Sequence, residues 1–210
     1  MAKVTVPQEN RTIEQRDEVA EFLAAHKIAY SHWGLDRLVG DDATDSEILA
    51  AYSPEIDQLK LIGKFVTADV IGVTPDTPNL DVMLAKFSKE HTHAEDEVRF
   101  IVKGRGTFHI HTAETTSNSD GEVFAIEMEA GDWISVPAGT RHWFDLCTER
   151  TIRAIRLFKD TSGWTPNYVE NSILHETYAP VCWGPRYVTS GGIRLKANIP
   201  WLQHDSNERT

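Results

Sequence analysis

Apolar residues in the first ninety positions recur mostly with the period of an α-helix. Thr12 with Gln15, and Thr44 with Glu47, match the capping box that begins many helices. The apolar positions that follow helix-start signals are Val19, Phe22 and Leu23; Ile48, Leu49 and Tyr52; Ile56 and Leu59 after Pro54; and Leu80, Met83, Leu84 and Phe87. The β-branched run 65–73 predicts a strand. We therefore expect residues 1–90 to be mostly helical, with one or two strands.

From residue 91 onward, apolar and polar residues alternate with period two, as in strands that bury one face. Val98 and Phe100 alternate with Arg99, and Gly104-Arg-Gly106 is predicted to turn the chain. Further short strands are predicted at 108–111, 123–128, 133–136, 141–146 and 151–158, with 112–121 as a long polar hairpin loop. This spacing of short strands and turn signals predicts a β-sandwich or barrel.

The chain length favours one domain over residues 1–210. Its expected parts are the helical region 1–90, a β-barrel core 91–160 that carries the chemistry, and a tail 161–210 that packs back on the barrel. Aromatic residues that could fix this tail are Trp164, Tyr168, Tyr178, Trp183 and Trp201.

The net charge and the distribution of apolar residues argue against nucleic acid and membrane as binding partners of this protein. The chain has 21 Lys plus Arg against 32 Asp plus Glu, a formal net charge of −11, which argues against binding to a nucleic-acid backbone. No apolar run is long enough for a membrane span, and the N-terminus lacks the apolar core of a signal peptide. Cys147 and Cys182 have no paired spacing. We expect reduced thiols in a cytoplasmic protein.

Two short blocks about forty residues apart contain the candidate chemistry. The first is His91-Thr-His93-Ala-Glu-Asp-Glu97, and the second runs from Gly131 through Pro137-Ala-Gly139-Thr-Arg to His142. An i, i+2 pair on a strand points both imidazoles to one face, and imidazole with carboxylate suits a divalent first-row metal. We predict that His91, His93, Glu97 and His142 bind one metal ion. The other histidines, His26, His32, His109, His111, His175 and His204, are expected to be ordinary surface or core residues.

The two blocks match the conserved blocks of the cupin superfamily. The longer stretch from His91 to Phe100, together with Ile-Ser-Val-Pro-Ala-Gly-Thr-Arg-His142-Trp-Phe-Asp, resembles the bacterial acireductone dioxygenases. Upstream, Trp33-Gly-Leu-Asp-Arg and Ala50-Ala-Tyr extend the similarity, which covers roughly residues 25 to 168. The loop 112–121 and the tail after Tyr168 are longer than in that family.

The resemblance implies a mainly β fold, the cupin double-stranded β-helix or jelly-roll barrel, with N-terminal helices packed outside. It implies a cytoplasmic monomer or homodimer that acts on a small enediol, acireductone (1,2-dihydroxy-3-keto-5-methylthiopentene), with O2 in methionine salvage. With Fe(II), one per chain, the products would be 4-methylthio-2-oxobutanoate and formate. With Ni(II) they would be methylthiopropionate, formate and carbon monoxide. Partners of other kinds, nucleic acid and membrane, are not expected.

Several further residues gain roles from the same comparison. Arg99 lies two residues beyond Glu97, so it faces the same way on a regular strand and could neutralise an anionic substrate. Phe144, Arg156 and Trp164 resemble pocket residues of the family. Glu95 and Asp96 are expected at the rim of the site and receive no chemical role.

Two alternatives stay open. One is a different cupin dioxygenase, for instance a quercetinase-like enzyme that cleaves another enediol, which the unfamiliar tail keeps in view. The other is a non-enzymatic cupin that binds a metal or ligand for sensing or storage. Oxygen uptake with an acireductone analogue would discriminate among these.

Overall fold

The computed structural model describes residues 1–35, 40, 42–113, 121–160, 165–183, 186–189 and 192–195. Trp164, Trp201 and most of the predicted loop 112–121 lie outside the described residues. The helices are α1 (Arg16–Ala25), α2 (Asp45–Ala51), α3 (Ser53–Gly63), α4 (Leu80–Leu84), α5 (Leu174–Thr177) and the 3₁₀ turns η1 (Pro7–Glu9) and η2 (Val181–Trp183). The strands are β1 (Lys3–Val6), β2 (Arg11–Ile13), β3 (Ala29–His32), β4 (Thr67–Val73), β5 (His91–Thr92), β6 (Glu97–His111), β7 (Val123–Glu129), β8 (Asp132–Val136), β9 (Arg141–Leu146), β10 (Ile152–Phe158), β11 (Asn167–Tyr168), β12 (Arg186–Thr189) and β13 (Gly192–Leu195).

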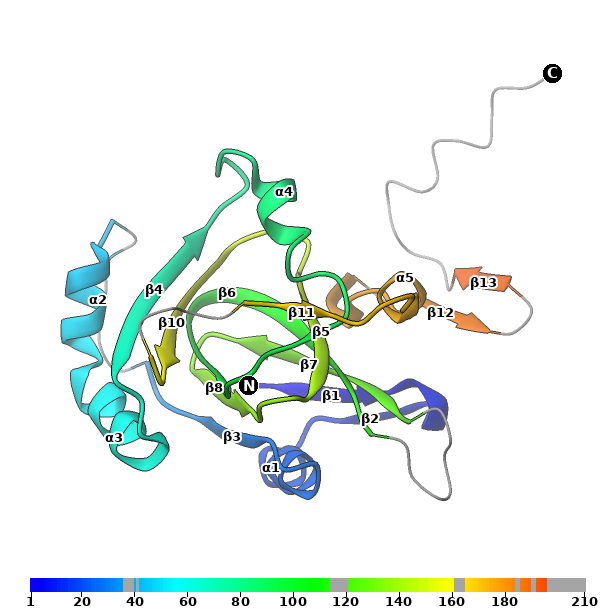
Figure 1. Ribbon diagram of the computed structural model, residues 1–210, viewed down its shortest axis with the longest axis horizontal. Coiled ribbons are helices and arrows are strands. Elements are labelled where there is room, and N and C mark those ends of the chain that lie inside the picture. The colour runs from blue at the N-terminus through cyan, green and yellow to red at the C-terminus, as the bar shows by residue number, and fades with distance from the viewer. Residues whose placement is uncertain are drawn as a thin grey trace.

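Strand β6 belongs to two antiparallel sheets and joins them into one β structure (Figure 1). Its first half pairs with β8 and β10, which extend to β3 and β4. Its second half pairs with β7 and β9, which extend to β1, β2, β5 and β11. The mainly β fold with helices packed outside, which the sequence predicts, is therefore confirmed.

The glycines predicted to turn the chain instead bend one continuous strand, so the turn prediction at 104–106 is wrong. Gly104 has φ +80°, and a Cβ there would lie 2.0 Å from the carbonyl oxygen of Thr151. A Cβ on Gly106 would lie 2.2 Å from the ring of Phe144. Only glycine permits this close approach, and the bend lets β6 leave one sheet and enter the other.

The Gly104 bend gives a stability prediction. Gly104→Ala should lower the free energy of unfolding by about 2–4 kcal/mol, because backbone strain adds to collision with Thr151. Gly139→Ala is the matched control, since Gly139 has φ +75° but no atom within 4 Å of the place that a Cβ would take, and should cost only about 1 kcal/mol. Urea unfolding of the metal-free proteins measures both. Equal losses would show that the close approach at Gly104 contributes nothing.

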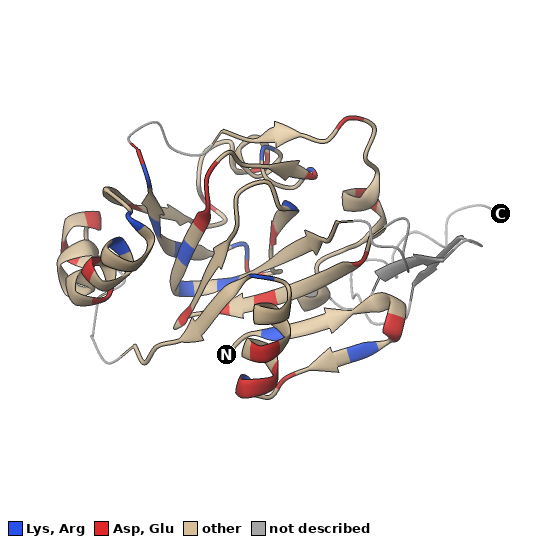
Figure 2. Cartoon of the chain, turned by 60° about the horizontal axis from the view of Figure 1, so that its bottom comes forward, with Lys and Arg blue, Asp and Glu red and all other residues tan. Residues whose placement is uncertain are grey.

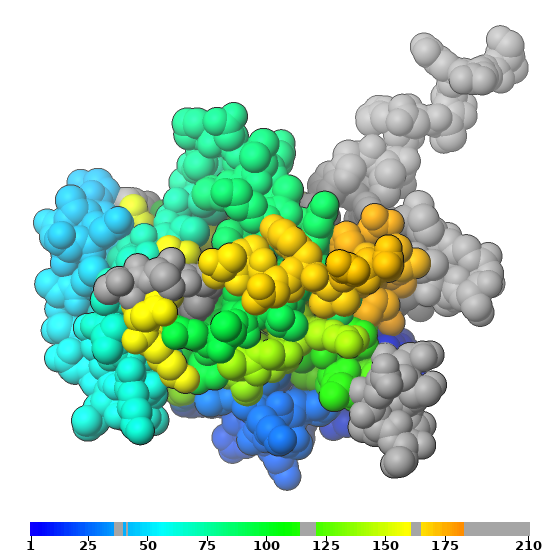
Figure 3. All heavy atoms as spheres, viewed as in Figure 1, coloured from blue at the N-terminus to red at the C-terminus, as the bar shows by residue number. Residues whose placement is uncertain are grey.

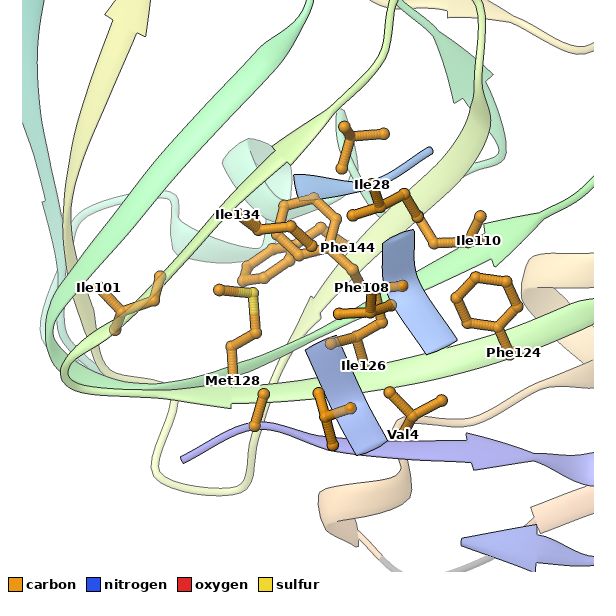
Figure 4. Close-up of a cluster of buried hydrophobic side chains, with 14 of the residues drawn as sticks. Val4, Ile28, Ile101, Phe108, Ile110, Phe124, Ile126, Met128, Ile134 and Phe144 are labelled. Carbon is orange, nitrogen blue, oxygen red and sulfur yellow. The ribbon is translucent and has the colours of Figure 1, made fainter. Parts of the chain in front are cut away.

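Two apolar clusters hold the elements in place. The larger lies between the sheets and includes Phe108, Ile110, Ile126 and Phe144, whose side chains gather inside the barrel in Figure 4. The smaller lies where α2 and α3 cover the outer side of β4, β6 and β10; its buried members are Ile48, Tyr52, Ile56, Leu59, Phe65, Val98, Phe100, Ile155 and Leu157. Alternate residues of β6 thus face the helices or the barrel interior.

The N-terminal region contains more strand than its sequence pattern predicts. Besides β4, it forms β1, β2 and β3, and Thr12 lies in β2 instead of beginning a helix. Helix α1 begins after Gln15 with no side-chain cap. In contrast, the Thr44–Glu47 capping box is present and Pro54 lies in the first turn of α3, as predicted. Helix α4 ends at Leu84, so it is shorter than the pattern through Phe87 indicates.

The two cysteines are joined in a disulfide, Cys147–Cys182, with their Cα atoms 5.5 Å apart. The prediction of reduced thiols is therefore wrong, because the chain folds back and brings Cys182 to the end of β9, a proximity that a separation of 35 residues does not signal. Acidic and basic positions are interspersed over the described elements (Figure 2). Within those elements, no helix combines the length and apolar character that crossing a bilayer requires.

Candidate metal centre

The four predicted ligand residues converge at one end of the barrel. His91 on β5 pairs directly with His142 on β9, and Glu97 is the first residue of β6. His93 follows β5, and its carbonyl oxygen accepts a hydrogen bond from the N–H of Gly139, which ties the two sequence blocks together. One ligand atom from each of the four residues lies within 4.8 Å of all the others, and every side chain is buried.

Hydrogen bonds fix the orientation of all three imidazoles. Nδ1 of His91 lies 2.6 Å from Lys89 O, Nδ1 of His93 lies 3.1 Å from Thr165 O, and Nδ1 of His142 lies 2.8 Å from Thr140 O. Because a carbonyl oxygen only accepts, each Nδ1 carries the proton. Each ring therefore directs Nε2 to the centre, and with Nδ1 engaged this is the nitrogen that would bind a metal ion.

Glu97 completes the donor set. Its Oε2 lies 2.8 Å from His142 Nε2 and 3.3 Å from His93 Nε2, whereas its Oε1 accepts a 2.6 Å hydrogen bond from Arg99 Nε. Burial opposes the charge on Glu97, but Arg99 and the two histidines hold its pKa well below the usual value. Burial and the neighbouring His142 lower the pKa of His91 to about 4. Three imidazoles around an ionised carboxylate fit a divalent cation.

Arg99 extends from the carboxylate into an aromatic pocket. Its guanidinium carbon lies 4.7 Å from the ring centroid of Phe144, 5.4 Å from Phe108 and 5.9 Å from Phe87. Only 4% of Arg99 is exposed, so its charge acts at low dielectric next to the centre. The sequence predicts Arg99 and Phe144 in this pocket but not Phe108 and Phe87. Phe108 faces the same side of β6 as Arg99, because the irregular part of the strand shifts the alternation by one residue.

Arg156 lies on the same inner face. It is the cross-strand partner of both Arg99 and Asp69, and residues in direct register point to one side of a sheet. Two hydrogen bonds of 2.8 and 2.6 Å join its guanidinium to Asp69, a partner that the sequence does not indicate. Trp164, the third predicted pocket residue, lies outside the described residues.

Glu95, Asp96, His109 and His111, to which the sequence assigns no chemical role, lie outside the ligand set. Asp96 accepts hydrogen bonds from Ala138 N and Lys159 Nζ at the rim, and Glu95 accepts one from Lys159 N. His109 and His111 point away from the barrel interior, because the alternate positions 108 and 110 point inward. His109 stacks on Trp143 at 4.7 Å, and His111 Nδ1 lies 2.6 Å from Glu90.

Comparisons with known proteins agree with this geometry. Residues 3–166 match the model of the ARD/ARD' family. The chain is 37% identical to acireductone dioxygenase of Sulfurihydrogenibium sp. (strain YO3AOP1), covering 81% of this chain and 96% of that one. It is 40% identical to the enzyme of that name from Bacillus thuringiensis (strain Al Hakam), covering 80% and 100%. A solved structure, acireductone dioxygenase from Bacillus anthracis with a cadmium ion in the active centre, superposes with TM-score 0.72 at 39% identity, covering 80% and 98%.

Proposed function

The chain belongs to the ARD/ARD' family, and on this premise we propose that it is a metal-dependent dioxygenase that cleaves acireductone with O2. The observation that carries the proposal is the meeting of four ligand atoms within 4.8 Å, beside one buried arginine. The site is one for a divalent metal, and His91, His93, Glu97 and His142 would hold it. We take the ion to be Fe(II) or Ni(II), one per chain. When bound, it would supply Lewis acidity to an enediol that chelates it.

Arg99 has two tasks in this proposal. Through Nε it holds Oε1 of Glu97, so that Oε2 stays directed to the centre. Its positive charge, buried among the three phenylalanines, favours the deprotonated form of an incoming enediol.

The aromatic walls would exclude water and accept an apolar substrate chain. Phe144 and Phe108, with ring centroids 4.8 Å apart, form one such wall. Arg156 is already neutralised by Asp69, so we assign it to the shape of the pocket and not to substrate charge. Product choice, oligomeric state and cellular location stay predictions.

The test is turnover with defined metals. Protein reconstituted with Fe(II) alone is expected to consume O2 with acireductone and to release formate and 4-methylthio-2-oxobutanoate; protein with Ni(II) alone should release carbon monoxide. Oxygen uptake and product identification measure both. Uptake with a flavonol but not with acireductone would favour the quercetinase-like alternative, and stoichiometric metal without uptake on either would favour a binding protein.

A further inference from the structure

The C-terminal strap, residues 165–182, runs across the barrel and reaches the metal centre from outside. Figure 3 shows its golden to orange atoms lying over the green barrel strands. The family match ends at residue 166, so almost all of the strap lies beyond it. The strap therefore lies outside the two sequence blocks that hold the ligand residues.

The first part of the strap contacts the backbone and side chains of two ligand residues. Thr165 O accepts the hydrogen bond from His93 Nδ1 that sets the orientation of this ring. Tyr168 pairs with His91 in the β11–β5 ladder, and Val169 N donates to Glu90 O at 3.0 Å. Partners that orient a metal-binding imidazole in this way contribute to metal affinity. Movement of the strap would therefore change the orientation of the His93 ring and the position of the His91 backbone relative to the metal centre.

Apolar burial does little to hold the strap on the barrel. Within residues 165–182 only Pro180 is buried, and Ile173 is 65% exposed. Contacts of this kind contribute little of the hydrophobic free energy that fixes most surface segments. The strap must be held by other means.

Polar groups form further contacts. Ser172 hydrogen-bonds Glu90, which also contacts His111, and the side-chain amide of Gln8 lies 3.2 Å from the hydroxyl of Tyr178. Beneath this part lie His109 and Asp145, with His109 Nδ1 and Asp145 Oδ2 3.7 Å apart, too far for a hydrogen bond. Burial raises the pKa of Asp145 to about 7.

The covalent anchor is the disulfide at the end of the strap. Cys182 is bonded to Cys147, which is buried directly after β9, the strand that carries His142. A cross-link here restricts the strap whatever the strength of its polar contacts. Cys182 itself is only half-buried, so a small reductant can approach the bond.

We propose that the C-terminal strap is a redox-sensitive positioning element: the Cys147–Cys182 disulfide holds it closed, and the closed strap orients His91 and His93. The inference rests on the proposed metal-binding role of these histidines. A dithiol would open it by donating two electrons to the sulfur–sulfur bond; its two protons end on Cys147 and Cys182, and the dithiol becomes a cyclic disulfide. The opened strap retains metal less well.

The experiment compares metal release from the folded protein in the two redox states. Oxidised protein loaded with Co²⁺ is mixed with excess EDTA, and bound cobalt is followed by its visible spectrum and by elemental analysis. A second sample is treated anaerobically with dithiothreitol, desalted, loaded and mixed in the same way. Reduction is expected to accelerate release by about tenfold or more. Cys182→Ser and Cys147→Ser should release as fast as reduced wild type, and dithiothreitol should not change them further.

Hydrogen exchange adds a readout that does not depend on the variants. In the reduced protein the amides of residues 165–182 and of 89–93 should exchange faster, whereas those of β7 should not change. Equal release and equal exchange in the two redox states of folded wild type would overturn the strap proposal and leave the proposed function intact. Oxidised protein that binds no cobalt would overturn both.

Discussion

His93→Ala is expected to lose nearly all of its divalent metal and its turnover, while the protein remains folded. The substitution removes one of four ligand atoms and leaves the other three unable to complete the set. Loss of a partner outside the ligand shell already costs 10- to 100-fold in affinity, so loss of a ligand should cost about 10²-fold or more. Elemental analysis after dialysis, with O2 uptake on acireductone, measures the result.

His26→Ala is the matched control for this variant. His26 lies at the C-terminal end of α1, where its ring contacts Phe22 and Phe124 and has no part in the metal centre. It should keep its full metal content and rate. A His93→Ala protein with wild-type metal occupancy would contradict the assignment of His93 as a ligand.

Arg99→Ala should still bind metal, less tightly because Glu97 loses the partner of its Oε1, and at full metal occupancy should lose about 10²-fold or more in kcat/KM. All four ligands remain, yet the substrate anion loses the buried charge that stabilises it, and a lost electrostatic stabiliser costs on this scale. Arg99→Lys keeps the charge, but a lysine cannot both hold Glu97 as Nε does and lie flat over Phe144. Its kcat/KM should therefore fall between those of wild type and Arg99→Ala. Steady-state kinetics on metal-matched samples separate the three.

Arg105→Ala supplies the control for removing a cation from the same strand. Arg105 makes ion pairs with Glu127 and Glu149 at the surface, so its loss should leave kcat/KM unchanged. If Arg99→Ala turned over at the wild-type rate with full metal, Arg99 would have no part in the chemistry.

The barrel and its metal centre could be predicted because both depend on local sequence pattern. The alternation in β8 reports burial directly, the apolar runs of β7, β9 and β10 mark strands buried over most of their length, and the two histidine blocks place ligands on adjacent strands. Strands β1, β2 and β3 are only three or four residues long, too short to show a period. β1 and β3 become strands through pairing with β7 and β8, and β2 through pairing with β1, which is tertiary information.

The surroundings of the site depend on contacts between distant segments, which explains what the sequence could not predict. Asp69 meets Arg156 across 87 residues, and Thr165 reaches His93 across 72. Cys147 and Cys182 come together only because the strap folds back over β9. The sequence marks Gly104 as a special position. That it bends a strand instead of turning the chain follows from the close approach of Thr151, which exists only once β10 is in place.

The most direct test of the central claim is anomalous diffraction at the metal absorption edge from crystals of the reconstituted protein. We predict a single peak per chain at about 2.0–2.2 Å from Nε2 of His91, His93 and His142 and from Oε2 of Glu97. A peak bound by other residues, or four ordered side chains with no peak among them, would contradict the account.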